Sequence, residues 1–508
     1  MSRRSASQLI ACAALAAIVP ARADTLPRAA WVPDGLLAGL QNSALDIAAG
    51  ELEAAADQQL RDRLYALNNA VIYDNGCFWE YNAYIDHVSY VDFDYPSMVI
   101  ESREGTLHAD FTITNLRIEF VLDGEGLFCS DSYDCDSAID VGLMSGGGDA
   151  ALSVAGGHVV AQMTSTSATV SGYEYDTEWD CFIIELIAEI LQDTIEEGLE
   201  DELLAVMDEG LPEAIEDLFG DLEFAEDGDI YEVPYFIEGR PRTVLAASTG
   251  ITIGEETQVT SASAPCGPMI DDFRYTAGAA PVFGAGIPGT GDPFDMVVSL
   301  SDDLLNQLLY VSYDSGALCM VLDENSEDPY GLTWDLTTTD MALFFPELYE
   351  LAPDAATKIE IAPRAAPHAA IGEGDGFVEG QLEIFLAETE FSMFVDIDGT
   401  WEKALSLAIS ADTEFLVRVS QAGALRIYMS DLFGISIEIE EEPLVDLNDP
   451  VIELLMPRLL SVVVPLLFTT LDSVWLPHLE GYAMVPLAVL ADGPNADFLS
   501  IYVQLVGP

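Results

Sequence analysis

The chain is poor in basic residues and rich in acidic ones. It has 17 Lys and Arg against 89 Asp and Glu, which gives a formal net charge of −72. Lys358 and Lys403 are its only lysines. A negative field of this size repels nucleic acid and anionic membranes, although salt screens it within about 8 Å. We therefore expect no nucleic-acid partner and only peripheral or transient contact with membranes.

The sequence also lacks the usual catalytic patterns. Its five histidines form no H-E-x-x-H arrangement or close pair, and no G-x-S-x-G elbow is present. Residues 284–289 match G-x-G-x-x-G, but Pro288 and the Thr-Gly-Asp-Pro that follows exclude the helix that a dinucleotide site requires. We expect a protein that is not an enzyme and holds no cofactor, with a secreted hydrolase kept as an alternative.

A strongly apolar run near the C-terminus is too short to cross a membrane. Residues 459–471 carry no charge, include Pro465, and lie between Arg458 and Asp472. A membrane-spanning helix needs about 20 apolar residues. The run instead predicts part of a buried helix over residues 449–473.

The N-terminus has the features of a secretory signal. Arg3 and Arg4 precede an apolar stretch over residues 9–19, and Ala21-Arg22-Ala23 fits a cleavage site. We expect a secreted or periplasmic protein cleaved after residue 23. Leu9-Ile10-Ala11-Cys12 also fits a bacterial lipoprotein box, so anchoring through Cys12 is the alternative.

The composition predicts a folded protein with an acidic surface. Half of the residues are apolar and the mean hydropathy is +0.25, whereas disordered acidic chains lack that apolar content. The length is enough for two or three domains. An acidic, lysine-poor surface suits salty external water.

Six cysteines remain once the N-terminal segment is removed. An even number in a secreted chain predicts disulfide bonds. Cys129 and Cys135 are the easiest pair because they close a short loop. The other four allow three pairings, which stay open. They are Cys77, Cys181, Cys266 and Cys319.

An acidic loop surrounds the first cysteine pair. Asp131, Asp134 and Asp136 lie in it, and grouped carboxylates can hold calcium through their oxygens. The spacing does not match an EF-hand. We expect a solvated loop, and these three residues are weak candidates for a structural calcium site.

Hydrophobic periodicity divides the first half into two helices and two groups of strands. Apolar residues recur at helical spacing over residues 35–67 and again over 182–218, where Pro212 interrupts the pattern. Residues 71–175 and 225–262 are rich in β-formers and predict strands.

The second half opens with a strand and a capped helix. The apolar residues 296–300 predict the strand, and Ser301 can cap a helix over 301–312. Asp302 and Asp303 then lie where the helix dipole favours negative charge. We expect these acids to stabilise the helix end and not to form a charged recognition site.

This stretch begins a second copy of the plan of the first half. Helix, strands, long helix and closing strands recur in the same order, with Asp398-Gly399 predicting a hairpin turn. The Gly-, Pro- and Ala-rich residues 263–293 predict a linker between the two copies. The expected divisions are a signal peptide at 1–23, a first domain at 24–262 and a second domain at 294–508.

An ordered series of short matches accompanies this plan. In the first half they are Tyr84-Ile85-Asp86, Tyr95-Pro96, Leu107-His108-Ala109 and Phe111. In the second half they are Leu300-Ser301-Asp302, Asn306, Tyr313, Gly316, Leu318, Ile361-Ala362-Pro363, Pro367-His368, Leu476-Pro477, Val485-Pro486-Leu487 and Asp497-Phe498-Leu499. Over about residues 30–506 the chain resembles the bactericidal permeability-increasing protein family, which includes lipopolysaccharide-binding protein and cholesteryl ester transfer protein.

The resemblance implies an α+β fold of two tandem tubular lipid-binding domains. Each would be a long helix wrapped by a highly curved antiparallel sheet, in an elongated boomerang with a shared central sheet. It implies a monomer that binds a phospholipid or another acyl-chain ligand in one apolar pocket per domain. The pocket candidates are Leu36, Leu40, Ile183, Ile187, Ile190, Leu304, Leu308, Leu455, Leu459 and Val463.

Departures from the family shape the expected function. Members that capture anionic endotoxin use basic tips, which this chain lacks, so neutral or zwitterionic lipids or lipids bridged by divalent cations are the expected ligands. Cys181 lies near a family cysteine whose partner is on the following helix, where this chain has Leu203 and Leu204. The alternative function is a structural or interaction protein whose pockets are filled by its own side chains.

Overall fold

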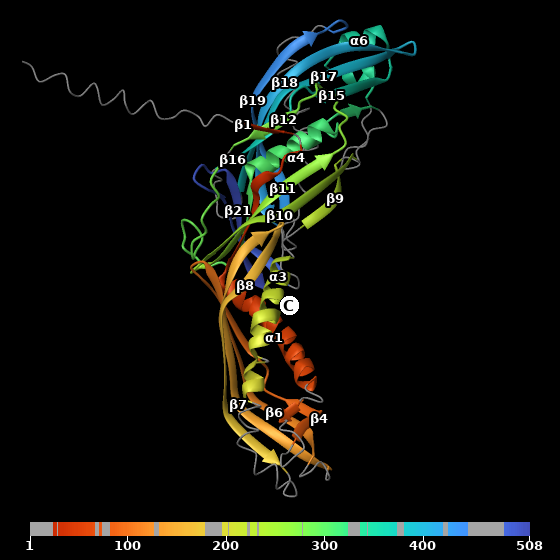
Figure 1. Ribbon diagram of the computed structural model, residues 1–508. Helices are drawn as coiled ribbons and strands as arrows, with labels where there is room; N and C mark the ends of the chain where they lie inside the picture. Colours follow the sequence, from red (N-terminus) through yellow and green to blue (C-terminus); the bar gives the residue numbers. More distant parts are fainter. Residues whose placement is uncertain are drawn as a thin grey trace, which may run out of the picture.

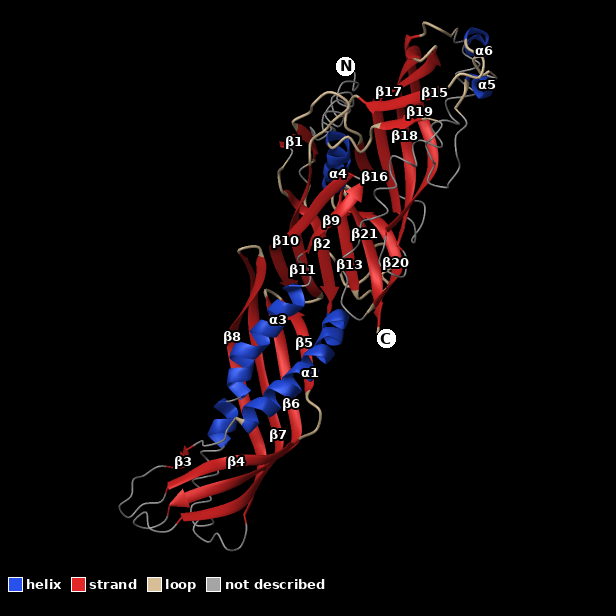
Figure 2. Cartoon of the chain, turned by 90° about the vertical axis from the view of Figure 1, so that its right-hand side faces the viewer, coloured by secondary structure: helices blue, strands red, loops and turns tan. Residues whose placement is uncertain are grey.

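The molecule is elongated, with a lobe at each end and a central sheet between them (Figure 1 and Figure 2). No helix in the described part of the chain is long and apolar enough to cross a membrane. The computed structural model describes residues 24–27, 29–66, 71–73, 82–125, 132–177, 196–201, 203–220, 224–230, 233–276, 278–323, 336–342, 344–372, 380–419, 425–445 and 482–507.

Strands from both halves of the sequence form the central sheet. Its order is β20-β21-β13-β2-β11-β10-β9. β2 pairs with β11 of its own half and with β13 of the other half, where Leu40 lies opposite Met296 and Leu36 opposite Leu300. The sheet therefore joins the two lobes, as the resemblance predicts. The strands are β2 Val32–Gln41, β9 Phe224–Ile230, β10 Val233–Ala247, β11 Gly250–Ser261, β13 Met296–Ser301, β20 Ala483–Asp492 and β21 Phe498–Val506.

The first lobe is an antiparallel sheet with helices across one face (Figure 2). The sheet has the order β3-β4-β6-β7-β8, and β5 pairs with β6. Its strands are β3 Val71–Tyr73, β4 Asn82–Asp92, β5 Ser97–Arg103, β6 Thr106–Glu125, β7 Ser132–Ala155 and β8 His158–Thr177. Its helices are α1 Asn42–Tyr65, the π-helical turn η2 Val206–Gly210 and α3 Leu211–Gly220.

The second lobe repeats the antiparallel sheet. Its order is β14-β15-β17-β18-β19, and β16 pairs with β17. Helix α4 packs against β16 of this lobe and against β11 of the central sheet. The strands are β14 Met320–Leu322, β15 Thr357–Pro363, β16 His368–Gly372, β17 Gly380–Ile397, β18 Thr400–Val419 and β19 Leu425–Glu441. The helices are α4 Asp302–Asp314, α5 Thr338–Met341 and α6 Pro346–Leu351.

The first helix begins at Asn42, so the prediction of a helix from Gly35 was wrong. Leu36 and Leu40 lie instead on β2, which has a hydrogen-bonded strand on each side. Most of this strand is buried, which is typical of a central strand covered on both faces. Its leucines fit a helical spacing, but sheet pairing with distant strands outweighs that local preference.

The predicted linker is tied to the start of the second lobe. A short strand in it, β12 Asp272–Tyr275, pairs with β1 Asp24–Pro27. A disulfide joins Cys266 to Cys319, beyond the end of α4. The Tyr310 hydroxyl on α4 also donates a hydrogen bond to a backbone carbonyl of the segment, at Ile270. These contacts fasten the segment over one side of α4.

Several local predictions are confirmed. The Ser301 side chain accepts a hydrogen bond from the Leu304 N–H at 3.1 Å, so it is the N-cap of α4. Asp398 and Gly399, with φ of 54° and 83°, make the turn between β17 and β18. Pro212 lies at the start of α3, directly after η2, where the helical pattern is interrupted. The predicted signal peptide and the helix over 449–473 lie outside the described residues.

Candidate functional site

The helices of the first lobe enclose an apolar face of its sheet. α1 packs against β4 and β5, and α3 packs against β8, so the two helices lie over opposite sides of the same face (Figure 2). Side chains from the sheet and the helices form one continuous buried cluster. It includes Phe111, Ile113, Ile118, Phe120, Ile139, Val141 and Met144 from the sheet, and Leu60, Leu64, Leu203, Met207, Ile215 and Phe219 from the helices.

A glycine lets the helix that leads into α3 lie close to the sheet. A Cβ atom at Gly146 on β7 would lie 3.2 Å from Leu203 Cγ and 3.3 Å from Met207 Cγ. Both distances are tighter than ordinary carbon contacts, so a side chain here would push the helix outward. Leu203 and Met207 are almost fully buried at this position.

Polar side chains of α1 cover the β5 edge of the sheet. The Glu53 carboxylate accepts a hydrogen bond from the Met98 N–H at 2.7 Å. The Asn42 side-chain oxygen accepts one from the Ser102 N–H at 3.0 Å. An edge strand otherwise presents unpaired N–H groups, which are a template for adding another strand. The helix therefore takes the place that a further strand would occupy.

The opposite edge, β8, is covered in the same way. The Glu200 carboxylate accepts a hydrogen bond from the Val170 N–H at 3.2 Å, and Glu216 accepts one from the Ala161 N–H at 3.0 Å. The sheet and the helices therefore hold apolar side chains between them, with polar contacts along both edges of the sheet.

The second lobe has a similar division between an apolar and a polar face. A bulge between Leu386 and Thr389 on β17 changes which alternate residues face the core. Beyond it Phe391 and Met393 are buried in the main cluster, while Glu390 lies on the other face. The apolar face of this sheet is continuous with the main core.

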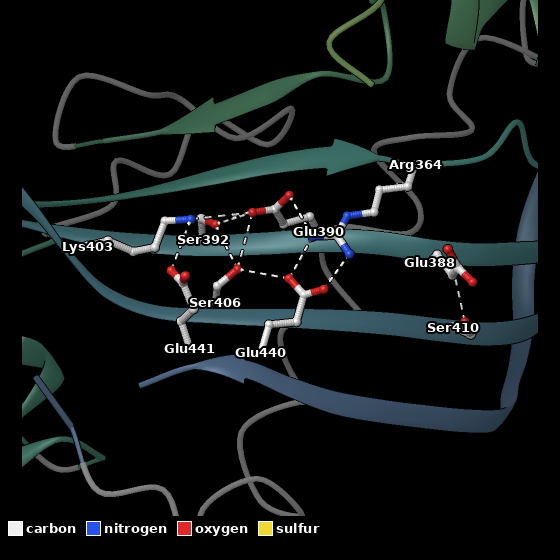
Figure 3. Close-up of polar contacts among 9 residues, drawn as sticks. All are labelled: Arg364, Glu388, Glu390, Ser392, Lys403, Ser406, Ser410, Glu440 and Glu441. Atoms are coloured by element: carbon white, nitrogen blue, oxygen red, sulfur yellow. Dashed lines mark hydrogen bonds and ion pairs between the residues drawn. The ribbon is translucent and has the colours of Figure 1, made fainter. Parts of the chain in front are cut away.

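A network of ion pairs covers the polar face of the second lobe (Figure 3). Arg364 donates to both oxygens of Glu440 on β19 and to Glu390 on β17, the latter at 3.0 Å. Lys403 on β18 lies 3.6 Å from Glu390 and 3.7 Å from Glu441. The network therefore joins three adjacent strands across their bulged region.

The electrostatic centre of this network is Glu390. Burial alone would raise the pKa of its carboxyl. Hydrogen bonds from Ser392, Arg364 and Ser406 outweigh burial and lower that pKa to about 2. Glu390 thus stays charged through all ordinary conditions, and Arg364 and Lys403 are both paired with carboxylates.

The structure brings the predicted pocket residues into two regions. Leu36 and Leu40 are buried in the central sheet, and Leu304 and Leu308 are buried on α4. All four belong to the main apolar cluster. The other candidates, Ile183, Ile187, Ile190, Leu455, Leu459 and Val463, lie outside the described residues.

Sequence patterns did not identify the side chains that close the first lobe. Glu53, Glu200 and Glu216 lie on helices whose wet faces carry many other acids, so nothing in the pattern separates them. Only their position beside an unpaired strand edge distinguishes them. That position depends on how the helices pack.

The cysteine predictions are answered in part. Cys266 pairs with Cys319, which was one of the open alternatives. Cys135 is also disulfide-bonded, and its partner lies outside the described residues. Its pairing with Cys129, and the roles of Cys77 and Cys181, stay predictions.

The calcium candidates of the acidic loop fall only partly within the described residues. Asp134 and Asp136 lie on β7, and Asp131 is outside the described residues. Within the described ranges, no group of three or more His, Cys, Asp or Glu residues is arranged to hold a metal ion.

Comparisons with known proteins support the fold prediction. A crystal structure of lipopolysaccharide binding protein matches 94% of this chain and 100% of that chain, with 12% identity and a TM-score of 0.54. P47 of Clostridium botulinum E1 matches 95% of this chain and all of that one at 8% identity, but its TM-score of 0.28 carries no weight. No protein-family model and no curated protein sequence matches the chain.

The chain therefore has the fold of a lipopolysaccharide binding protein. The two lobes and the shared central sheet are those that the sequence resemblance predicts. At 12% identity the match establishes the fold alone, and the ligand has to be argued from the residues of this chain.

Proposed function

We propose that this protein binds lipid and holds acyl chains inside its lobes. The observation that carries the proposal is the first lobe, where two helices close the apolar face of the sheet at both edges. The similar fold of a lipopolysaccharide binding protein supports it. The protein would work by binding alone, without a catalytic group.

The energy available from such an interior is large. Burying one methylene group is worth about 0.8 kcal/mol, so a chain of about sixteen carbons offers roughly 13 kcal/mol before ordering costs. An apolar interior can thus keep a lipid chain out of water without any charged residue, as storage or transfer requires.

We propose a neutral or zwitterionic lipid as the ligand. Anionic lipid recognition needs cations that are available to a phosphate group. In the first lobe Arg61, Arg63, Arg103 and Arg117 each lie within ion-pair distance of an Asp or Glu of the chain. The positive charge of each arginine is therefore paired with a carboxylate of the chain, and the surrounding acidic surface repels anionic headgroups.

The first test is native mass spectrometry of the purified full chain, with organic extraction of anything bound. We expect a co-purifying lipid, and saturable uptake of a fluorescent acyl probe after the lipid is removed. A protein that carries no lipid and takes up no probe would have a self-filled interior. That result would favour the structural or interaction protein instead.

A pair of variants tests where the acyl chain lies. Met207→Trp adds bulk inside the first lobe, next to Gly146, whereas Leu143→Trp adds the same ring at an exposed position of β7. We expect the first variant to reduce probe uptake and the second to leave it unchanged. Circular dichroism of both variants checks that each is folded. Equal uptake in the two would place the ligand elsewhere.

A further inference from the structure

A polar cavity lies at the N-terminal end of α4, apart from the apolar lobe interiors. Its volume is about 230 Å³. Asp302 and Asp303 of α4 line it. Phe498, the first residue of β21, and Asp497 just before it also line it. Tyr275 of β12 and Arg242 of β10 are further parts of its wall. Segments that are far apart in the sequence therefore meet around one small space.

Asp497 is buried with few polar contacts. Its exposed fraction is 5%, and neither carboxylate oxygen makes a hydrogen bond of normal geometry. Burial raises the pKa of its carboxyl, and the neighbouring Asn495 side chain offsets this only in part. Backbone packs tightly around it, because a Cβ atom at Gly278 would lie 1.9 Å from one oxygen and a Cβ at Gly493 2.7 Å from the other. An unpaired buried carboxylate is costly unless a ligand compensates it.

Two further carboxylates at the helix end increase that cost. One oxygen of Asp302 is also buried without a partner. The Asp303 carboxylate accepts a hydrogen bond from the Thr276 N–H at 2.6 Å. Burial and then the Asp497 charge raise the pKa of Asp302 to about 7, and burial raises the pKa of Asp303 to about 8. The cavity is therefore lined by three carboxyl groups, those of Asp302, Asp303 and Asp497, that are poorly solvated by water.

The basic residue of the cavity does not neutralise these acids. Arg242 lies 3.5 Å from Asp34, which also lines the cavity, and is about half exposed. The Arg274 charge acts on Asp302 and Asp303 only as a weaker effect than burial. Above about pH 8, where both aspartates are ionised, a cationic guest would complete the charge balance.

We propose that this cavity binds an organic ammonium group. The carboxylates of Asp302, Asp303 and Asp497 line one small space, and an ammonium group is a cation of matching size and charge. The volume suits a trimethylammonium group or a primary amine of similar size. The inference does not depend on the proposed lipid function, since the cavity is separate from the lobe interiors.

Two sources can supply an ammonium group. One is a small free solute, and the other is the headgroup of a zwitterionic lipid. In a headgroup the ammonium would lie against Asp497 and Asp302.

The test is calorimetric titration of the full chain with choline at about pH 9, above the pKa values of both helix-end aspartates. The neutral isostere 3,3-dimethylbutan-1-ol and calcium chloride are titrated in parallel. We expect choline to bind and the alcohol not to bind. Binding of calcium without choline, or of the alcohol as tightly as choline, overturns the proposal, as does the absence of choline binding.

Matched substitutions locate the bound cation. Asp497→Asn and Asp302→Asn should each weaken choline binding about tenfold or more, because each removes a charge with little change in shape. Asp314→Asn makes the same change at the other, buried end of α4 and should leave binding unchanged. Unchanged affinity in both cavity variants overturns the proposal, and thermal melting confirms that the variants are folded.

Vesicles distinguish the two sources. Flotation with phosphatidylcholine vesicles that is lost in Asp497→Asn, and absent with phosphatidylglycerol vesicles, identifies a lipid headgroup. Choline binding without such flotation identifies a free solute. Because acyl-probe uptake is measured separately, failure of this site and failure of the lipid-binding interior give different results.

Discussion

The Glu216 carboxylate of α3 accepts a hydrogen bond from the backbone N–H of Ala161 on β8 at 3.0 Å. This contact joins the helix to the free edge of the first lobe's sheet. Glu200 makes the equivalent contact with Val170, and η2 lies between the two glutamates. The helix is thus fastened at two points with a π-helical turn between them, which is a common place for a helix to bend.

Removing these contacts should loosen the helix. In a Glu200→Ala, Glu216→Ala double variant we expect unfolding to be easier by about 1 to 3 kcal/mol for each hydrogen bond lost. Amide exchange at Ala161 and Val170 should speed up, as measured by hydrogen exchange with mass spectrometry. Glu213→Ala, an exposed acid on the same helix, is the control. Equal protection of both amides in the double variant would contradict the role that we assign to the glutamates.

The disulfide between Cys266 and Cys319 should stabilise the second half. It closes a loop with a sequence separation of 53 residues, and a loop of that length corresponds to about 4 kcal/mol of chain entropy. We expect a Cys266→Ser, Cys319→Ser variant to unfold at clearly lower urea concentration than the wild type. A midpoint unchanged by the substitutions would show that the contacts of Tyr310 and its neighbours hold this segment without the disulfide.

Stability should fall as the pH rises from about 4 to about 8. In the folded chain the pKa of Asp302 is about 7 and that of Asp303 about 8, both above the ordinary value of 3.8. Between these limits the unfolded chain is ionised at these positions while the folded chain holds the protons, so their contribution is lost as the pH rises through 7 and 8. Urea unfolding at several pH values measures the slope.

Neighbouring charges also act on these two aspartates, so the pH dependence of the unfolding free energy needs control variants. Asp497 adds repulsion, and Arg274 opposes it from nearby. An Asp302→Asn, Asp303→Asn variant should show a flatter dependence over the same pH range, whereas Asp314→Asn should keep the wild-type slope. A slope equal to wild type in the double variant would mean that other groups cause it.

Strong acid should destabilise the second lobe through Glu390. Its folded pKa of about 2 lies below the ordinary value of 4.5, so its contribution is present above pH 4.5 and is lost as the pH falls toward 2. We expect Glu390→Gln to be less stable than wild type at neutral pH and less sensitive to acid in this range. Fluorescence of the native tryptophans during acid titration follows the change. Parallel acid curves for the two proteins would exclude Glu390 as the group responsible.

Local sequence patterns predicted the elements whose residues interact with near neighbours. Ser301 caps α4 through a contact three residues away, and Asp398-Gly399 forms its turn from its own backbone preferences. The strands of both lobes were also visible, because alternation along a strand reflects one buried face. The start of α1 was mistaken because Leu36 and Leu40 fit a helical spacing while their partners, Leu300 and Met296, lie about 260 residues away.

The sequence by itself determined an acidic, folded chain built from two copies of one plan. Net charge and apolar content are totals over the chain, and periodicity depends only on residues that are near one another in the sequence. All three can therefore be obtained without the fold. Tertiary structure alone decided that glutamates close the edges of the first lobe and that Asp302 meets Asp497 around a cavity. Those relationships join residues that are distant along the chain, and packing, not local preference, brings them within contact distance.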